Sequence, residues 1–150
     1  MPRLLIVHHS PSPRVRGIAD AVARGARHPD INDVEVVERA ALEATADDLR
    51  AADGILLGTT VNFGYISGAL KHFFDTTYHE VREETAKRPF SYWIHGSHDT
   101  TGAEQAMASI TTGYGWMLAA EPVVLIGEVT QVHIDRSAEL GAIMAATVMR

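Results

Sequence analysis

Two serines directly follow an apolar run near the start of the chain. Residues 4–7 read Leu-Leu-Ile-Val, and Ser10 and Ser12 come within five residues of them. A helical pattern opens at once behind the serines, with apolar residues at 15, 18, 19, 22, 23 and 26. Free backbone N–H groups and the helix dipole favour an anion at a helix N-terminus. The segment therefore suggests a phosphate site.

The same residues also suit an ordinary helix start. Ser12 is a good N-cap and Pro13 a good first helical residue. Pro11 and Pro13 also lack the backbone N–H groups that a phosphate would use. This segment alone leaves both interpretations open.

The composition indicates one compact domain over residues 1–150. The sequence is 46% hydrophobic and 21% charged, which suits a single core. It has no cysteine, which excludes disulfides, thiol nucleophiles and Cys-ligated metals. The net charge of −6 argues against a nucleic-acid partner. We see no bilayer-length apolar stretch and no signal sequence, so we expect a cytoplasmic protein without a membrane span.

Strand-like runs alternate with helical patterns along the whole chain. We expect strands at 3–8, 34–37, 54–58, 90–94 and 122–127. Helical stretches are expected behind the first loop, at 45–50, 66–77, 103–112 ending near Gly113, and up to 148 with Asp135 as the cap. This alternation predicts an α/β fold with a doubly wound, five-stranded parallel sheet and helices on both faces. Ligands of such folds bind beyond the carboxyl ends of the strands, so the loops after the first, third and fourth strands matter most.

The segment after the third strand carries the most specific motif. Residues 58–75 read GTTVNFGYISGALKHFFD. This segment resembles the flavodoxin-like FMN-binding family, in particular its NAD(P)H:quinone oxidoreductase and NADPH-dependent FMN reductase branch. The positions in register are Gly58, Thr59, Gly64, Ser67, Gly68, Leu70, Lys71, Phe73 or Phe74, and Asp75. The looser resemblance covers residues 4–127 and implies the flavodoxin-like strand order 2-1-3-4-5.

The resemblance assigns the loop after the third strand to the ring system of FMN. Its backbone N–H groups suit the polar ring edge, and Gly64 permits a close approach or a positive φ. Phe63 or Tyr65 suits a ring face, although single aromatic residues are more often packing residues. The expected contacts are Thr60, Val61, Asn62, Phe63, Gly64 and Tyr65. Lys71 and Asp75, one helical turn apart, are expected to form a surface pair.

The resemblance also assigns the FMN phosphate to the first loop. Ser10 and Ser12 match hydroxyl positions of the family, whereas Pro13 replaces a glycine and Val15 replaces a third hydroxyl. We expect Arg14 to compensate with a charge-assisted contact, which contributes about 1.5–3 kcal/mol.

The loop after the fourth strand departs from the family at His98 and Asp99, which stand where the family tends to have Gly and Thr. We expect this loop to border the flavin through His95, Gly96, Ser97, His98 and Gly102. His98 is the one candidate catalytic residue, because its charge changes near neutral pH and suits proton relay to an acceptor. Asp99 is better explained as a helix cap.

The histidines do not predict a metal site. His95 and His98 have ligand-like spacing but lack a third ligand, so we expect no metal. One of His8 and His9 must face the core, where a hydrogen-bonded core histidine is the simpler explanation.

The resemblance implies an FMN-dependent oxidoreductase. Electrons would pass from NADPH or NADH through FMN to a quinone or similar small-molecule acceptor. The alternative is a flavodoxin, an electron-transfer protein without a substrate of its own. The mild acidity, together with Arg14 and Arg16 near the site, favours the enzyme. Such reductases often associate, so a homo-oligomer is also expected.

Overall fold

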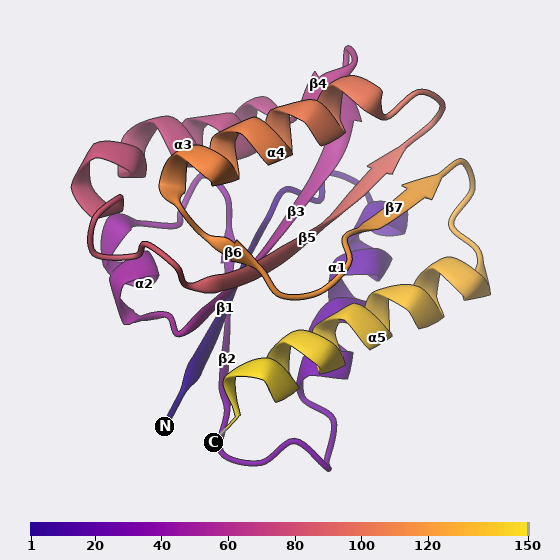
Figure 1. Ribbon diagram of the computed structural model, residues 1–150. Coiled ribbons are helices and arrows are strands. Elements are labelled where there is room, and N and C mark those ends of the chain that lie inside the picture. Colours follow the sequence, from indigo (N-terminus) through magenta and orange to yellow (C-terminus); the bar gives the residue numbers. More distant parts are fainter. Residues whose placement is uncertain (150) are drawn as a thin grey trace.

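Parallel strands form the centre of the molecule, with helices on both faces (Figure 1). The computed structural model describes residues 1–149. The hydrogen-bonded order is β2-β1-β3-β5-β6, while β7 pairs with β5 and β4 turns back on β3. The strands are β1 (Arg3–His8), β2 (Glu35–Ala40), β3 (Gly54–Asn62), β4 (Tyr65–Ile66), β5 (Pro89–Gly96), β6 (Met117–Leu118) and β7 (Val123–Ile126).

The helices form two layers that each cover one apolar face of the sheet (Figure 1). Two helices, α1 (Pro13–Ala26) and α5 (Gln131–Val148), pack on one face. The other face is covered by α2 (Ala46–Ala51), α3 (Gly68–Val81) and α4 (Thr101–Tyr114). No helix within residues 1–149 has the length and apolar character needed to cross a lipid bilayer.

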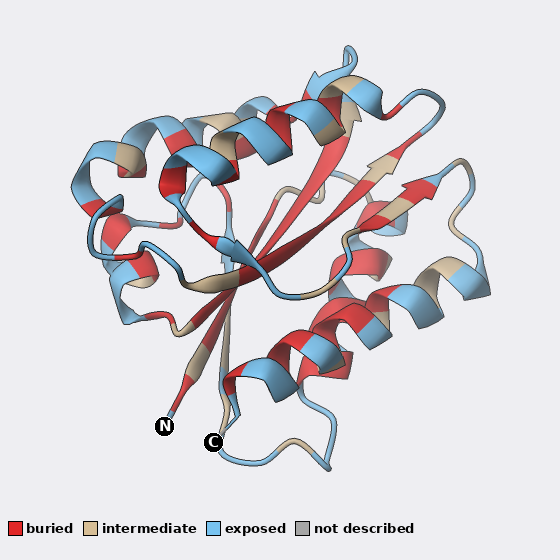
Figure 2. Cartoon of the chain, viewed as in Figure 1, coloured by how far each residue is buried: buried red, intermediate tan, exposed pale blue. Residues whose placement is uncertain are grey.

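The central strands supply side chains to both cores. In β1, Leu4 and Ile6 belong to the core beneath α1 and α5, whereas Leu5 and Val7 belong to the opposite one. Successive side chains of a strand point to opposite faces, so a strand covered on both sides is apolar throughout. Figure 2 shows β1, β3 and most of β5 as buried, which explains their continuous apolar runs.

The predicted doubly wound sheet with order 2-1-3-4-5 is confirmed, with one refinement in its fifth position. That position is shared by two short strands: β6 pairs with the start of β5 and β7 with its end. Pro122 lies between them and has no N–H to donate to a ladder.

Several predicted boundaries are wrong. The third strand runs to Asn62 rather than to 58, and the helix expected at 66–77 is α3, which starts at Gly68 because Ile66 belongs to β4. The second strand lies at 35–40 rather than 34–37. Helix α4 continues to Tyr114 and ends at Gly115, whose φ of 73° is left-handed, rather than near Gly113. The last helix is capped by Thr130, whose side chain accepts from the His133 N–H, and not by Asp135. The two helix ends depend on cap geometry, which apolar periodicity does not encode.

Candidate functional site

The three predicted loops leave the sheet at one rim, where the arrows of β3 and β5 end in Figure 1. In the strand register His8 pairs with Gly58, and Thr60 pairs with His95. The His9 N–H also donates to the Gly58 carbonyl at 3.1 Å. Because parallel strands end on the same side, residues 9–14, 60–65 and 95–102 lie along neighbouring strand ends.

The first loop starts α1 in the way its sequence predicts. Ser12 is the N-cap, its hydroxyl accepts from the Val15 N–H at 3.4 Å, and Pro13 is the first helical residue. Arg14 and Arg16 are exposed, and neither forms an ion pair with any residue in the described part of the chain. Positive charge at a helix N-terminus opposes the helix dipole unless an anion is present. The charge placement of α1 therefore suits a bound anion.

A buried histidine lies directly beneath this loop. His8 is 4% exposed, and its Nδ1 is 2.8 Å from the Ser10 hydroxyl oxygen. Its Nε2 lies 3.6 Å from a carboxylate oxygen of Glu38. Burial lowers the pKa of His8 from its ordinary value, and the Glu38 carboxylate opposes this shift in part. His8 is thus the predicted core histidine.

The second loop is a tight hairpin between β3 and β4. Val61 pairs with Ile66 and Asn62 with Tyr65, so Phe63 and Gly64 form a two-residue turn. Both turn residues have positive φ, 51° for Phe63 and 76° for Gly64, which is the conformation of a type I′ turn. Positive φ is strained for phenylalanine, and its side chain is fully exposed. A strained, exposed aromatic residue at a strand end fits a binding role better than a packing role.

Two contacts fix this hairpin relative to its neighbours. The Thr59 hydroxyl accepts from the Ser67 N–H at 2.9 Å and donates to the Thr60 carbonyl at 2.8 Å. A Cβ atom at Gly102 would lie 1.9 Å from the Gly64 carbonyl oxygen, so only glycine lets α4 approach the hairpin this closely. The second and third loops are therefore in direct contact.

In the third loop, Ser97 and His98 face solvent, whereas the ring of His95 contacts the segment after β7. His95 Nε2 lies 2.7 Å from the Gly127 carbonyl oxygen, which ties the end of β5 to the segment after β7. Ser97 and His98 are exposed, and His98 has no hydrogen-bond or ion-pair partner within residues 1–149. Gly96 is buried beside Val61.

The N-cap of α4 is Thr100, whose side chain makes no cap hydrogen bond, and Asp99 lies one residue before it. Its carboxylate accepts from the Thr101 N–H at 2.9 Å, and this hydrogen bonding lowers the pKa of Asp99. Lys71 and Asp75 form the predicted surface ion pair at 2.9 Å. In the described part of the chain, no group of three His, Asp or Glu side chains is placed to hold a metal ion.

Two neighbours of His8 were missed by the sequence analysis. Glu38 comes beside His8 only through the pairing of β1 with β2, and nothing in the sequence near Glu38 signals this. Trp93 lies with its ring centroid 5.8 Å from that of His8. The same indole covers Gly58, where a Cβ atom would lie 2.0 Å from Trp93 Cζ2.

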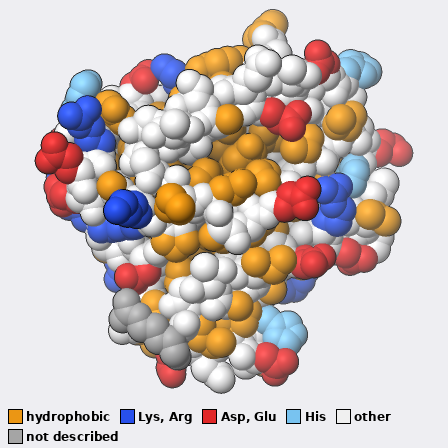
Figure 3. All heavy atoms as spheres, in the orientation of Figure 1, with side chains coloured by type: hydrophobic (Ala, Val, Ile, Leu, Met, Phe, Trp, Pro, Cys, Tyr) orange, Lys and Arg blue, Asp and Glu red, His pale blue; other side chains and the backbone are white. Residues whose placement is uncertain are grey.

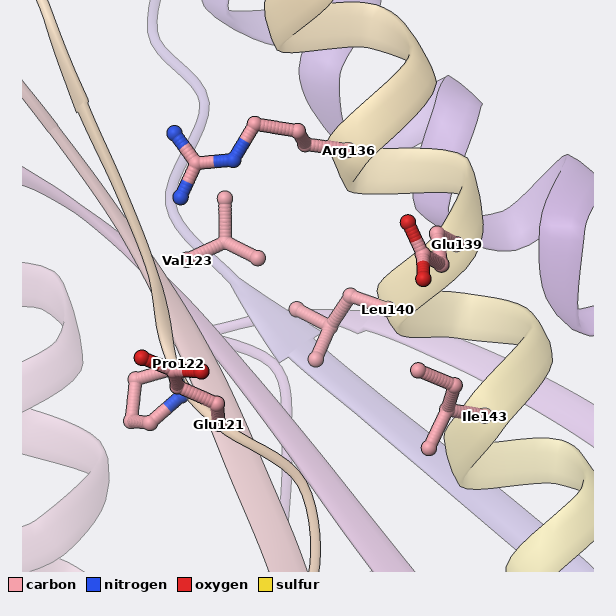
Figure 4. A pocket seen from close by; sticks show the side chains of 7 residues that line it. All are labelled: Glu121, Pro122, Val123, Arg136, Glu139, Leu140 and Ile143. Carbon is pink, nitrogen blue, oxygen red and sulfur yellow. The ribbon is translucent and has the colours of Figure 1, made fainter.

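A separate cavity of about 230 Å³ lies between β7 and α5 (Figure 4). Arg136, Glu139, Leu140 and Ile143 extend into it from the helix. None of the residues that line this cavity was predicted to bind the flavin. The cavity lies at the start of β7, where Val123 is, rather than at the rim. This cavity is therefore separate from the predicted residues at the strand ends.

Comparisons with known proteins agree with this architecture. A model of the NADPH-dependent FMN reductase family matches residues 12–131. An NAD(P)H dehydrogenase (quinone) of Acidithiobacillus ferrooxidans is 34% identical over 95 residues, covering 51% of this chain and 48% of that protein. A flavodoxin of Aquifex aeolicus is 33% identical over 75 residues, covering 50% of this chain and 40% of that protein. These matches span about half the length of the curated relatives or less.

Solved structures show the same fold at low identity. A flavodoxin from the domain Archaea has a TM-score of 0.80 and 16% identity, covering 97% of this chain and 98% of that one. A WrbA-like flavodoxin from Agrobacterium tumefaciens has a TM-score of 0.77 and 19% identity, covering 99% and 98%.

Proposed function

The chain belongs to the NADPH-dependent FMN reductase family, and we propose that it is an FMN-dependent oxidoreductase acting as a single flavin-binding domain. Its electrons would come from NADPH or NADH and go to a quinone or similar small-molecule acceptor. The observation that carries the proposal is the meeting of a positively charged helix N-terminus and a strained hairpin at one rim of a flavodoxin-like sheet.

The start of α1 fits the phosphate of FMN. Arg14 supplies a charge, and the hydroxyls of Ser10 and Ser12 supply donors at the same loop. Pro13 contributes no N–H but presets the helix start. Val15 is buried, so its contribution is limited to its backbone. This donor set is chemically suited to a phosphate monoester.

The hairpin fits the ring system of FMN. Its backbone groups from Thr60 to Tyr65 would face the polar edge, and Phe63 or Tyr65 would cover a ring face. Gly96, Ser97 and Gly102 would border the flavin from the third loop, and the backbone of His95 would do so while its ring holds Gly127. FMN, when bound, supplies two-electron chemistry between NAD(P)H and the acceptor.

We assign His98 a role in the same reaction. It is exposed on the third loop, so its imidazole is free to donate a proton to an acceptor oxygen near the flavin. Arg14, Arg16 and His98 also place positive or titratable groups near the site, which suits the negatively charged NAD(P)H.

A flavodoxin-type electron carrier is the second candidate. The similarity to the Aquifex aeolicus flavodoxin favours it, and so does the likeness of fold to flavodoxins along nearly the full chain. A carrier would bind FMN at the same loops but would not sustain oxidation of NAD(P)H by a quinone. The two candidates therefore differ in turnover and not in cofactor.

We also propose that copies of this chain associate through an exposed apolar edge of the sheet. Figure 3 shows hydrophobic atoms gathered in the middle of the face of the molecule that it displays, in the orientation of Figure 1. Exposed apolar side chains near the β6–β7 edge are Met117, Leu118, Ile126 and Ile143. Unpaired edges and apolar patches of this kind favour association. Sedimentation equilibrium at micromolar concentration tests this association, and a purely monomeric protein at that concentration would contradict it.

The experiment is a steady-state assay of NADPH and NADH oxidation by the FMN-loaded protein with a soluble quinone. We expect turnover that needs both substrates, and in His98→Ala a larger loss of kcat than of FMN affinity. Arg14→Ala should weaken FMN about tenfold to a hundredfold but leave riboflavin nearly unaffected, because riboflavin has no phosphate. Arg24→Ala, at the other end of α1, is the matched control and should bind both as wild type does. Absence of turnover with tight FMN binding would favour the carrier.

A further inference from the structure

Which of His8 and Ser10 donates in the hydrogen bond between them depends on the protonation of the His8 ring. Ser10 Oγ and His8 Nδ1 are 2.8 Å apart, and either atom can supply the hydrogen. A serine hydroxyl has one hydrogen, which it gives either to the imidazole or to a ligand, but not to both. The protonation of His8 therefore decides what Ser10 can offer to an anion at the start of α1.

In the neutral ring, the surroundings favour the proton on Nε2. Nε2 lies 3.6 Å from the Glu38 carboxylate, which stabilises an N–H on that side. Nδ1 is then the acceptor, and the Ser10 hydroxyl donates inward to it. In this state Ser10 presents only lone pairs to an incoming phosphate and would repel it.

Protonation of His8 reverses the bond. Nδ1–H then donates to Ser10 Oγ, and the Ser10 hydrogen becomes free to point at the loop. The ring also gains a positive charge beneath a site that would hold a phosphate with a charge of about −1.5 to −2. Both changes favour the anion.

Groups from several elements act on the protonation of His8. Burial is the largest effect and lowers the pKa of His8, and Arg16 of α1 adds to it. Glu38 of β2 and Asp20 of α1 favour the protonated ring and oppose this shift in part. Glu38 is itself paired with Arg27 at 3.2 Å. From β5 the neighbour is the uncharged ring of Trp93. A phosphate above Ser10 would add a charge that favours protonation.

We propose that His8 takes up a proton when a phosphate monoester binds at the start of α1, and that the protonated ring turns the Ser10 hydroxyl toward the phosphate. This inference rests on the proposed function, because it takes the FMN phosphate to lie at this loop. His8 would then be a positioning residue that acts through Ser10. FMN binding would strengthen as the pH falls, while riboflavin binding would not.

The test compares wild type with His8→Asn, whose amide can still bond to Ser10 but does not titrate. FMN and riboflavin affinities are measured by quenching of flavin fluorescence between pH 6 and 8. We expect the FMN affinity of wild type, divided by that of the variant, to rise as the pH falls over this range, with about tenfold as the limit that a rise of about one in the His8 pKa allows. The ratio removes the titration of the phosphate itself, which both proteins share. Riboflavin should give a flat ratio.

A second readout avoids the variant. The pKa of His8, followed by NMR of its imidazole protons in wild type, should rise by about one when FMN saturates the protein and stay constant with riboflavin. A flat affinity ratio or an unmoved His8 pKa, with FMN bound, would overturn the inference and leave the proposed function standing. Failure of wild type to bind FMN at any pH would overturn the proposed function, and the inference with it.

Discussion

Substitution of Gly102 by alanine tests whether α4 and the hairpin position the flavin ring together. The added Cβ would lie 1.9 Å from the Gly64 carbonyl oxygen, whereas real contacts of this kind exceed 3.0 Å. Both partners are backbone, so neither can rotate away. The hairpin and the helix must therefore separate by at least about 1 Å, and a displacement of that size can reduce a well-positioned interaction a hundredfold.

We expect Gly102→Ala to weaken FMN and riboflavin alike, by about tenfold to a hundredfold, or about 1.4–2.8 kcal/mol. The two flavins should respond equally because the hairpin would contact the ring that they share, not the phosphate. Overpacking strain of about 1–3 kcal/mol should lower the free energy of unfolding. The higher helix propensity of alanine offsets up to about 1 kcal/mol of this.

The assay is quenching of flavin fluorescence, with urea unfolding followed by circular dichroism. Gly113→Ala is the matched control, because it lies near the other end of α4 and its Cβ would meet Tyr78 at an ordinary 3.7 Å. The control should bind both flavins as wild type does. If folded Gly102→Ala also binds them with wild-type affinity, the contact between the second and third loops does not position the ring.

Two further substitutions separate binding from stability. Phe63→Ala should weaken both flavins by about 0.5–1.5 kcal/mol through lost stacking. It should leave the urea midpoint unchanged, since the side chain is fully exposed; unchanged flavin affinity would show that Phe63 does not contact the ring. Tyr114→Phe should lower the free energy of unfolding by about 1–3 kcal/mol, because the buried hydroxyl donates to the Phe74 carbonyl at 2.8 Å and lies 2.8 Å from the Thr77 hydroxyl. Burial raises the pKa of Tyr114 to about 12, so this loss should be constant from pH 6 to 9, and a wild-type urea midpoint would contradict it.

The order of elements was predictable because this sheet is buried on both faces. Runs such as Leu4–Val7 and Ile55–Leu57 are apolar at every position, which marks a central parallel strand without reference to the rest of the fold. Helix ends were less predictable because several polar residues compete for each cap. Asp135 was the cap expected from sequence, whereas the path of the chain after β7 gives this position to Thr130.

The convergence of the three loops at one rim was predictable, but the contacts between their residues were not. The motif at residues 58–75 predicted a loop followed by a helix, yet it revealed neither the hairpin nor the positive φ of Phe63. The partners of His8 and Gly102 come from distant parts of the chain: Glu38 through strand register and Gly64 through packing. Such pairings depend on tertiary structure, so a single sequence carries no local signal for them.

The most direct measurement is a titration of the purified protein with FMN, followed by visible absorbance and flavin fluorescence, with riboflavin in parallel. The account predicts saturable binding of one FMN per chain, and weaker binding of riboflavin because it lacks the phosphate that the start of α1 would hold. Absence of saturable FMN binding, or equal affinity for the two flavins, would contradict it.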